Sequence, residues 1–408
     1  MKILWVKAGG LVPPDTVGNI RSYKILRQIA RRHSVTFFSF HDADANHAHS
    51  ELANLFDRVV CLPLTLPAPK SLRELGAYCI HAFSRQPYNI SKYCRREVRT
   101  ELRQLLQRES FDVIVCDFLI AAGVIPWGLP LPKVLFTHNV ESAIWQRHYE
   151  VTRNPLWKAV SWREWRTMEA AEQNYLRRAD HVLTVSEEDG QSFRRYVDAA
   201  KLSVIPTGVD TEYFKPSSEP VTPNSIVFTG SMDWLPNEDG IAFFVEEILP
   251  LIRQQIPDVS LCVVGRNPSP QLKELAAKKR NVQVTGSVED VRPFLASGAV
   301  CVVPLRIGGG TRLKIFEAMA MGKAVVSTAV GAEGLPVEHG KHLIIADDPA
   351  SFARSVVDLL RDKEKRQPLE LAGRRLVEAS YSWDRVAAVF SDVLTEAVTR
   401  SRARSAQK

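Results

Sequence analysis

The chain has 408 residues, of which 45% are hydrophobic and 24% are charged, and its formal net charge is +7. This length exceeds the size at which one hydrophobic core stops growing, so we expect two domains of about 200 residues. No run of 18 apolar residues is present and the apolar start is too short for a signal peptide, so we expect a cytoplasmic protein without a membrane span. The positive charge favours an anionic partner: a nucleotide, an anionic membrane surface or nucleic acid.

The cysteines indicate neither disulfides nor a metal site. No CxxC pair and no metal-ligand spacing occurs among them, and three lie inside apolar, strand-like runs. We expect all six to be buried free thiols. They are Cys61, Cys79, Cys94, Cys116, Cys262 and Cys301.

The first half of the chain alternates short apolar runs with helical patterns. Such alternation predicts βα units and a parallel sheet. The expected strands are Ile3–Val6, Val35–Phe40, Val59–Leu62, Val113–Cys116, Val134–Thr137, Val182–Val185 and Val204–Pro206.

A polar, proline-containing stretch, Lys215–Pro223, interrupts this rhythm and is the expected interdomain linker and hinge. The alternation then restarts and predicts a second αβ sheet, so two Rossmann-like domains in tandem are indicated. An amphipathic helix is predicted from Trp383 to Val398, and the final Ser401–Lys408 are expected to be disordered. The strands expected in the second half are Ile226–Thr229, Leu261–Val264, Val282–Thr285, Val300–Val303, Val325–Thr328 and Leu343–Ala346.

Two long helices are expected in the first half. The helix from Lys92 to Arg108 has one apolar face and one arginine-rich face. The helix from Leu156 to Arg178 carries tryptophans among basic residues, which is typical of helices that lie against membrane headgroups. The alternative is that its tryptophans pack inward and its charges are hydrated, and glutamates that dilute the positive face favour this. The tryptophans are Trp157, Trp162 and Trp165, and the glutamates are Glu164, Glu169 and Glu172.

Several residues of the first half follow predicted strands. In a parallel sheet these positions lie at the carboxyl edge, where ligands bind. Gly9 and Gly10 follow the first strand, Asp117 ends the fourth, and His138 follows the fifth. Arg21, in the first turns of the next helix, is expected either to meet a phosphate or to face solvent.

Glycines also end three predicted strands of the second half. Gly230, Gly265 and Gly286 each follow an apolar run, and Val288 comes shortly after the third. Backbone can approach a ligand closely at glycines, so these loops suit a nucleotide, with its base near Val288.

A fourth strand is followed by Gly308-Gly309-Gly310-Thr311-Arg312 and then by a helix. Gly310, Lys314 and Glu317 stand at i, i+4 and i+7 and share one helical face. Backbone amides and an ammonium suit a diphosphate, and a carboxylate one turn further suits a ribose diol. The pattern therefore predicts a nucleotide diphosphate site; the alternative is a plain glycine turn followed by a hydrated Lys–Glu pair.

With these motifs in order, the sequence resembles the GT4-type glycosyltransferases, a large group that has the GT-B fold. The Gly308–Lys314 variant further resembles a bacterial subgroup linked to exopolysaccharide synthesis. The motifs that carry the resemblance are the opening glycine loop, Ala179–Ser186, Val204–Asp210 with Phe214, Phe228–Gly230, Val264-Gly265, Phe316–Gly322 and Gly331–Leu335.

The resemblance implies an α/β fold of two Rossmann-like domains facing a cleft. Residues 1–208 are then the acceptor-binding domain and residues 224–382 the nucleotide-sugar-binding domain, with the helix at 383–400 crossing back onto the first. It also implies transfer with retention of configuration, without a metal or another cofactor, from a donor such as a UDP- or GDP-sugar to a saccharide or lipid-linked acceptor. Glu317 would hold the ribose and His138 would contact the donor sugar.

Two positions depart from the family pattern. Gly309 stands where relatives have an acidic residue, and Ser231 stands where relatives have an arginine followed by a lysine. We hypothesise that Arg312 and Lys314 supply the missing positive charge, while Gly9, Gly10, Gly230, Gly265, Val288, Gly309, Gly310, Thr311 and Glu317 bind the donor.

Two alternatives stay open. A nucleotide-sugar 2-epimerase shares the two-domain shape but needs no acceptor. A non-catalytic nucleotide-binding component of a polysaccharide assembly complex would explain the departures at Gly309 and Ser231. Nucleic-acid binding is not expected, because the basic residues lie on mixed-charge helices without a reader motif.

Overall fold

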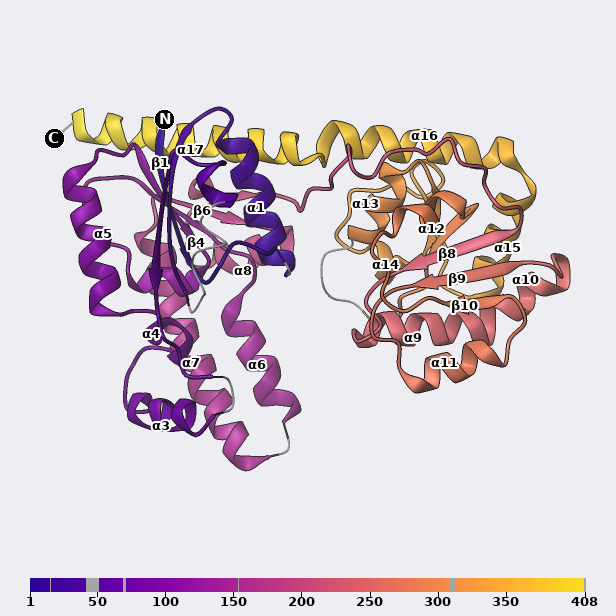
Figure 1. Cartoon of the computed structure of the whole chain (residues 1–408), viewed down its shortest axis with the longest axis horizontal. Helices are drawn as coiled ribbons and strands as arrows, with labels where there is room; N and C mark the ends of the chain where they lie inside the picture. The colour runs from indigo at the N-terminus through magenta and orange to yellow at the C-terminus, as the bar shows by residue number, and fades with distance from the viewer. Residues whose placement is uncertain (15, 42–50, 69–70, 153, 308–312, 407–408) are drawn as a thin grey trace. The chain divides into compact units, whose positions relative to one another are not determined.

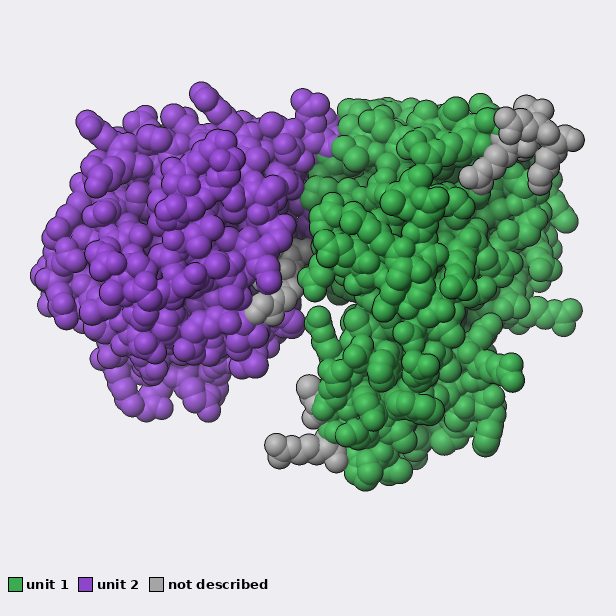
Figure 2. Space-filling view, turned by 180° about the vertical axis from the view of Figure 1, so that it is seen from behind, with its two compact units in different colours: residues 1–206, 386–408 green, residues 207–385 purple. Residues whose placement is uncertain are grey.

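The structure is a computed structural model and describes residues 1–14, 16–41, 51–68, 71–152, 154–307 and 313–406. The chain forms two compact units, which Figure 2 distinguishes by colour. Unit 1 comprises Met1–Pro206 with Val386–Lys408, and unit 2 comprises Thr207–Arg385. The chain thus passes between the units after Pro206 and again after Arg385, and the expected linker Lys215–Pro223 belongs to unit 2.

Unit 1 is built, in its described part, on a seven-stranded parallel sheet of order β3-β2-β1-β4-β5-β6-β7 (Figure 1). The seven apolar runs predicted in the first half all fall on these strands. The central residues of β1, β2, β4, β5 and β6 are buried, as expected of a parallel sheet covered by helices on both faces, whereas the edge strands β3 and β7 are partly exposed. The strands are β1 Lys2–Ala8, β2 Ser34–His41, β3 Arg58–Pro63, β4 Val113–Asp117, β5 Lys133–Phe136, β6 His181–Thr184 and β7 Leu202–Val204.

The described helices of unit 1 follow the strands in βα order. The helix predicted from Lys92 begins later, at Arg96, and buries Val98, Leu102 and Leu105 as expected. The helices are α1 Val17–Ile29, α3 Leu72–His81, α4 Tyr88–Ser91, α5 Arg96–Arg108, η1 Leu119–Gly123, α6 Glu141–Val151, α7 Pro155–Arg178, α8 Glu187–Arg194 and η2 Ala199–Lys201.

The tryptophan-rich helix α7 does not match the inward-packing alternative. Trp157 and Trp162 are 57% and 53% exposed, and Trp165 is half-buried. Two glutamates expected to be hydrated are instead buried: Glu164 accepts the backbone N–H of Tyr88 at 2.9 Å, and Glu172 accepts that of Ser142 at 3.2 Å. These amides come from segments far along the chain, so the spacing of charges within α7 did not reveal which ones face inward.

The last described helix, α17 (Trp383–Ala406), begins in unit 2 and continues into unit 1. It includes residues 401–406, so the expectation that these residues are disordered was wrong. Its Phe390 is fully buried in unit 1, where its ring stacks on Trp5 at 5.2 Å and meets Phe136 edge-on at 5.1 Å. The apolar stripe predicted at the end of the chain is therefore part of the core of unit 1.

Unit 2 contains, among its described residues, a six-stranded parallel sheet of order β10-β9-β8-β11-β12-β13. All six predicted strands fall on it, so the prediction of two Rossmann-like αβ sheets is confirmed. The strands are β8 Ser225–Thr229, β9 Ser260–Val264, β10 Val282–Val284, β11 Val300–Val303, β12 Ala324–Ser327 and β13 Ile344–Ile345. The helices are α9 Leu235–Phe243, the π-helical turn η3 Phe244–Ile248, α10 Leu249–Gln255, α11 Pro270–Ala277, α12 Arg292–Ser297, α13 Leu313–Ala320, α14 Ala329–Ala332, α15 Pro349–Arg361 and α16 Lys363–Ser380.

The cysteines are free thiols, but not all are buried. Cys116 and Cys301 are buried in strands, while Cys61, Cys94 and Cys262 are partly exposed. Cys79 is exposed, contrary to the prediction, because it lies on the outward face of α3.

Candidate functional site

Each sheet has one point where the strand order reverses, and loops from its carboxyl edge diverge there to leave a crevice. In unit 1 this point lies between β1 and β4, and in unit 2 between β8 and β11. Gly9 follows β1 at the reversal point of unit 1, and Gly230 follows β8 at the reversal point of unit 2. The segment after β11 leads to the glycine loop and α13. The predicted site residues thus gather at the two positions where open αβ sheets bind ligands.

The carboxyl edge of unit 1 is organised around the buried carboxylate of Asp117. Trp5 Nε1–H donates to its Oδ2 at 3.0 Å, His138 Nε2–H donates to its Oδ1 at 2.8 Å, and Lys7 Nζ lies 3.6 Å away. Burial alone raises the pKa of Asp117, but Lys7 and the hydrogen bond from His138 outweigh it and lower the pKa to about 2. Asp117 is therefore ionised at neutral pH.

His138 is 4% exposed, and both of its ring nitrogens are engaged within unit 1. Arg21 Nη1 lies 3.0 Å from Nδ1; because a guanidinium only donates, Nδ1 accepts and Nε2 carries the proton. Burial lowers the pKa of His138 to about 4, with Asp117 opposing this shift, so the imidazole is neutral near pH 7. His138 lies at the carboxyl edge as predicted, but its imidazole serves as a positioning group within the network.

Arg21 is also buried, with 2% of its surface exposed. Burial lowers the pKa of Arg21 to about 10, although Asp189 and Asp117 favour its charged form. The expectation that this side chain faces solvent was therefore wrong, while the expected phosphate contact stays a prediction. Its guanidinium instead orients His138.

Phe118, directly after β4, completes the network in a conformation rare for a residue with a side chain, at φ 68°. Its ring stacks on His138 with a centroid distance of 3.8 Å, and Lys7 Nζ lies 4.1 Å from its centroid. A Cβ on Gly18 would come within 2.4 Å of the Phe118 ring, so α1 requires glycine there. Nothing in the sequence pattern marked this contact, because the two residues are 100 positions apart.

The structural reasons for a glycine differ between positions Gly9 and Gly10. Gly9 has φ +88°, and nothing lies within 4 Å of where its Cβ would be, so the backbone conformation requires glycine. Gly10 has ordinary space around it, with the closest atom, the Val12 carbonyl oxygen, at 3.8 Å from the position of a Cβ. Both lie at the carboxyl edge, as predicted.

At the carboxyl edge of unit 2, Lys314 reaches over the end of β8. Its Nζ donates to Asn237 Oδ1 at 2.5 Å and lies 4.3 Å from the centroid of the Phe228 ring. A Cβ on Gly230 would stand 2.7 Å from Lys314 Nζ and 2.8 Å from Asn237 Nδ2. Gly230 thus makes room for a lysine and an amide rather than only for a ligand.

Gly265 shows the tightest backbone approach. A Cβ there would lie 1.7 Å from the carbonyl oxygen of Gly230, so the two strand-end loops pack directly on each other. This contact explains Gly265 without a ligand. Val288, the other predicted contact in this region, is half-buried and packs against the core of unit 2.

The same loop contact brings Arg266 beside Ser231, the position where the family pattern has an arginine. Arg266 Nε–H donates to Ser231 Oγ at 2.8 Å, and its side chain is 62% exposed. The sequence analysis missed this cation, because Arg266 follows a different strand. The signal that could have revealed Arg266 is its position directly after Gly265, a glycine that ends a strand.

Glu317 stands one turn after Lys314 on α13, so the two side chains share a face. Burial raises the pKa of Glu317 to about 7, and Lys314 opposes the shift. Among the described residues, none forms a side-chain hydrogen bond with this carboxylate, so its two oxygens can accept hydrogen bonds from a ligand. Gly309, Gly310, Thr311 and Arg312, also predicted for this site, lie outside the described residues.

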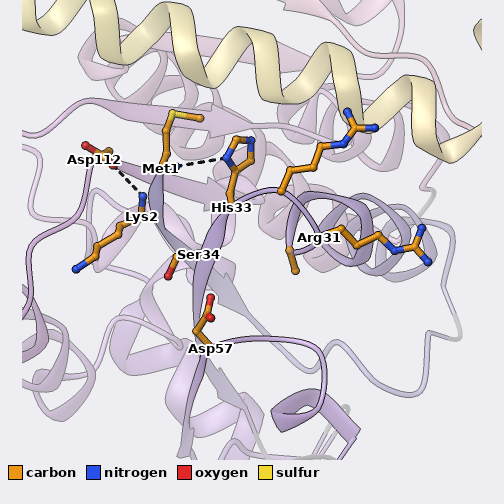
Figure 3. Close-up of a pocket in the computed structure, with 9 residues that line it drawn as sticks. Met1, Lys2, Arg31, His33, Ser34, Asp57 and Asp112 are labelled. Atoms are coloured by element: carbon orange, nitrogen blue, oxygen red, sulfur yellow. Dashed lines mark hydrogen bonds between the residues drawn. The ribbon is translucent and has the colours of Figure 1, made fainter.

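A pocket of about 530 Å³ lies at the opposite, amino edge of unit 1 (Figure 3). Met1, Lys2, His33, Asp57 and Asp112 are among the residues that line it. The pocket lies at the amino ends of the strands, whereas the predicted site residues of unit 1 lie at their carboxyl ends. Over the described ranges, no group of three or more His, Cys, Asp or Glu side chains could hold a metal ion, and no helix is long and apolar enough to cross a membrane.

Two family profiles match the chain in succession. One is described as Glycosyltransferase Family 4 and covers residues 19–213; the other is described as Glycosyl transferases group 1 and covers residues 223–362. With the two αβ sheets in place, the chain belongs to this family of glycosyltransferases.

Curated relatives agree with this assignment. An uncharacterized protein in the cps region of Klebsiella pneumoniae is 20% identical over 73% of this chain and 77% of its own length. The MMP alpha-(1->4)-mannosyltransferase of Mycolicibacterium hassiacum is 26% identical over 72% of each chain. The GDP-mannose-dependent alpha-(1-6)-phosphatidylinositol monomannoside mannosyltransferase of Mycobacterium tuberculosis is 28% identical, but the match spans only 56% of that enzyme and 48% of this chain.

Solved structures show the same GT-B fold. HepE from Anabaena, crystallised in complex with UDP, has a TM-score of 0.66 at 16% identity, covering 97% of this chain and 100% of that one. Sucrose-phosphate synthase from Thermosynechococcus elongatus has a TM-score of 0.65 at 18% identity, covering 97% and 98%.

Proposed function

We propose that this glycosyltransferase uses a nucleotide diphosphate sugar as donor, a UDP- or GDP-sugar, and transfers the sugar with retention of configuration to a saccharide or lipid-linked acceptor. The observation that carries the proposal is the pairing of Lys314 and Glu317 on one face of α13, beside the strand-end glycine Gly230. An ammonium suits the diphosphate and a carboxylate suits the ribose hydroxyls.

The chemistry is the departure of the nucleoside diphosphate. As the bond between the anomeric carbon and the diphosphate oxygen breaks, negative charge develops on the leaving group. Lys314 and the exposed Arg266 are the described cations at this edge, and Arg312 remains a predicted third. Such fixed charges can stabilise the leaving group without a metal, so we expect EDTA to leave the transfer rate unchanged.

The relatives support the same substrate class. Named mannosyltransferases that depend on GDP-mannose and a structural neighbour crystallised with UDP both use or bind nucleotide diphosphates. The relative in a cps region favours a role in cell-surface or exopolysaccharide synthesis. We propose that the transfer reaction takes place in the cytoplasm, where nucleotide sugars are made.

The test has two stages. A thermal-shift screen with UDP, GDP and ADP identifies the nucleotide, because a ligand that binds the folded state raises the melting temperature. The matching nucleotide sugars are then incubated with lipid-linked and free saccharide acceptors, and products are detected by mass spectrometry. We expect a glycosylated acceptor and release of the nucleoside diphosphate.

The alternatives give different products. A 2-epimerase would convert UDP-N-acetylglucosamine without any acceptor. A non-catalytic component would bind a nucleotide but yield no product with any donor and acceptor pair, and that result would overturn the proposal.

A further inference from the structure

The outer face of α3 is an apolar surface that no described part of unit 1 covers. Leu72, Leu75, Ile80 and Phe83 are 86%, 59%, 84% and 95% exposed, and Cys79 is exposed between them. Leu72, Leu75, Cys79 and Ile80, at i, i+3, i+7 and i+8, share one face of α3, and Phe83 lies two residues beyond its end; we call these five residues the α3 stripe. Single exposed apolar residues are common on proteins, but a whole helix that turns its apolar face outward is not.

This orientation is held in place by the inner face of α3. Arg163 of α7 donates to the carbonyl oxygens of His81 at 3.0 Å, Ala82 at 2.9 Å and Ser84 at 2.7 Å, which form the last turn of α3 and the residues after it. Tyr78 points inward, where its ring meets Tyr88 edge-on at 5.4 Å. Ser71 caps the start of the helix by accepting the N–H of Glu74. The stripe therefore faces outward because Arg163 of α7 holds the carboxyl end of α3 and Tyr78 packs on Tyr88 from the other face of the helix.

The first turns of α7 extend the surface. Leu156 is 78% exposed, and Trp157 and Trp162 are 57% and 53% exposed. In Figure 1, α3 and the first half of α7 lie at the end of unit 1 opposite to α17. Tryptophans favour the interface between lipid headgroups and acyl chains.

The charges on the outer faces of these two helices are mainly basic. Arg73, Arg85 and Lys158 are exposed on or next to α3 and α7. The acidic residues nearby oppose them little, since Glu164 and Glu172 are buried, Glu169 pairs with Arg166 at 2.8 Å, and Glu74 of α3 is half-buried. Apolar side chains bordered by exposed lysines and arginines match an anionic bilayer surface.

We propose that the α3 stripe, together with Leu156, Trp157 and Trp162 of α7, docks unit 1 on an anionic lipid bilayer. A second copy of the chain fits less well, because one helix of about 15 Å by 10 Å is much smaller than the about 800 Å² that each partner of a stable dimer buries. The net charge of +7 points the same way. This docking is independent of the donor and the reaction proposed above.

The topology fixes which edge of unit 1 would face the bilayer. Helix α6 leaves the carboxyl end of β5, and α7 returns to the amino end of β6. Because α7 has 24 residues and β6 only 4, the start of α7 extends roughly 20 Å beyond the carboxyl edge. The docking surface therefore lies on the same side of the sheet as Gly9 and His138.

The test is flotation of the purified full-length protein with vesicles. One set consists of phosphatidylcholine alone, and the other of equal parts of phosphatidylcholine and phosphatidylglycerol. We expect binding to the anionic vesicles, weaker binding to the neutral ones, and release by salt. The double variant Ile80→Asp/Phe83→Asp should bind the anionic vesicles at least about tenfold more weakly, because two apolar side chains no longer enter the bilayer.

Both substituted side chains are almost fully exposed, so the variant should fold, and circular dichroism and the melting temperature confirm this. The matched control is Leu371→Asp, which changes another exposed leucine, in α16 of unit 2, and should bind like the wild type. Arg73→Gln/Arg85→Gln should weaken binding to the anionic vesicles only. Equal flotation of the wild type and Ile80→Asp/Phe83→Asp, or a concentration-dependent dimer that this variant abolishes without any vesicle binding, would overturn the proposal.

Discussion

The carboxyl edges of the two sheets hold similar side chains in opposite states. In unit 1, Lys7, Arg21 and His138 surround one carboxylate, all of them buried and bonded to one another. In unit 2, Arg266 is largely exposed, Lys314 is held only part-buried, and the pKa of Glu317 is raised to about 7. A charge network that is satisfied internally holds loops in place, whereas an exposed cation and a carboxyl whose pKa is raised are typical of a ligand-binding site.

Asp117→Ala gives the largest expected effect, on stability. Removal of the carboxylate leaves the buried Lys7 ammonium without its ion-pair partner and His138 Nε2–H without its acceptor, which costs about 3–5 kcal/mol. Urea denaturation of the variant measures this loss. The control is Asp358→Ala, whose exposed carboxylate lies 3.9 Å from Lys365 and should change stability by less than about 0.5 kcal/mol. Similar urea midpoints for Asp117→Ala and Asp358→Ala would contradict the conclusion that the charges around Asp117 compensate one another.

Lys314→Ala should instead affect turnover. Loss of one charged contact to the leaving diphosphate typically slows transfer on the order of 100-fold, while the melting temperature changes little. Steady-state transfer with the donor found in the thermal-shift screen measures the effect. Lys341→Ala, which removes an exposed lysine paired with Glu338 in the same unit, is the control. Unchanged turnover in Lys314→Ala would reject its assignment.

Glu317→Gln should weaken donor binding by about 10- to 100-fold, the range for a lost charged hydrogen bond. The pKa of about 7 adds a pH dependence: below it the carboxyl is protonated and donor affinity falls, and above it affinity is full. The sign for stability is opposite, because burial disfavours the ionised form. The carboxyl of the free enzyme therefore contributes stability below pH 4.5 that is lost as pH rises through 7, so Glu317→Gln should melt higher than the wild type at alkaline pH.

Isothermal titration calorimetry of the wild type from about pH 6 to about pH 8 tests this linkage. A flat donor affinity over that range would show that Glu317 does not bind the ribose in its ionised form.

Gly18→Ala should have the smallest effect. The added methyl group meets the ring of Phe118, and overpacking of this kind costs about 1–3 kcal/mol. Gly76→Ala on α3 is the control, because nothing lies within 4 Å of that position and alanine favours a helix by about 0.5–1 kcal/mol. If both variants are equally stable, the Phe118 ring does not depend on Gly18.

The sequence predicted the thirteen strands found in the described residues, because buried parallel strands read as continuous apolar runs; the run Val204–Pro206 was displaced, since β7 is Leu202–Val204. It also predicted that Asp117, His138 and Gly230 lie at strand ends, since position alone decides this. It did not predict what these residues contact. Arg21 and His138 are 117 positions apart, and Ser231 and Arg266 are 35 apart, so their pairing depends on tertiary packing.

Helix α17 has a consequence for the order of folding. The aromatic cluster of Trp5 and Phe136 also requires Phe390, which is synthesised after all of unit 2. Unit 1 therefore cannot complete its core while unit 2 is still being made, although it is the first to leave the ribosome. Unit 2 is contiguous in sequence and can fold first, so an N-terminal fragment ending at Pro206 should remain incompletely packed until a peptide containing α17 is supplied.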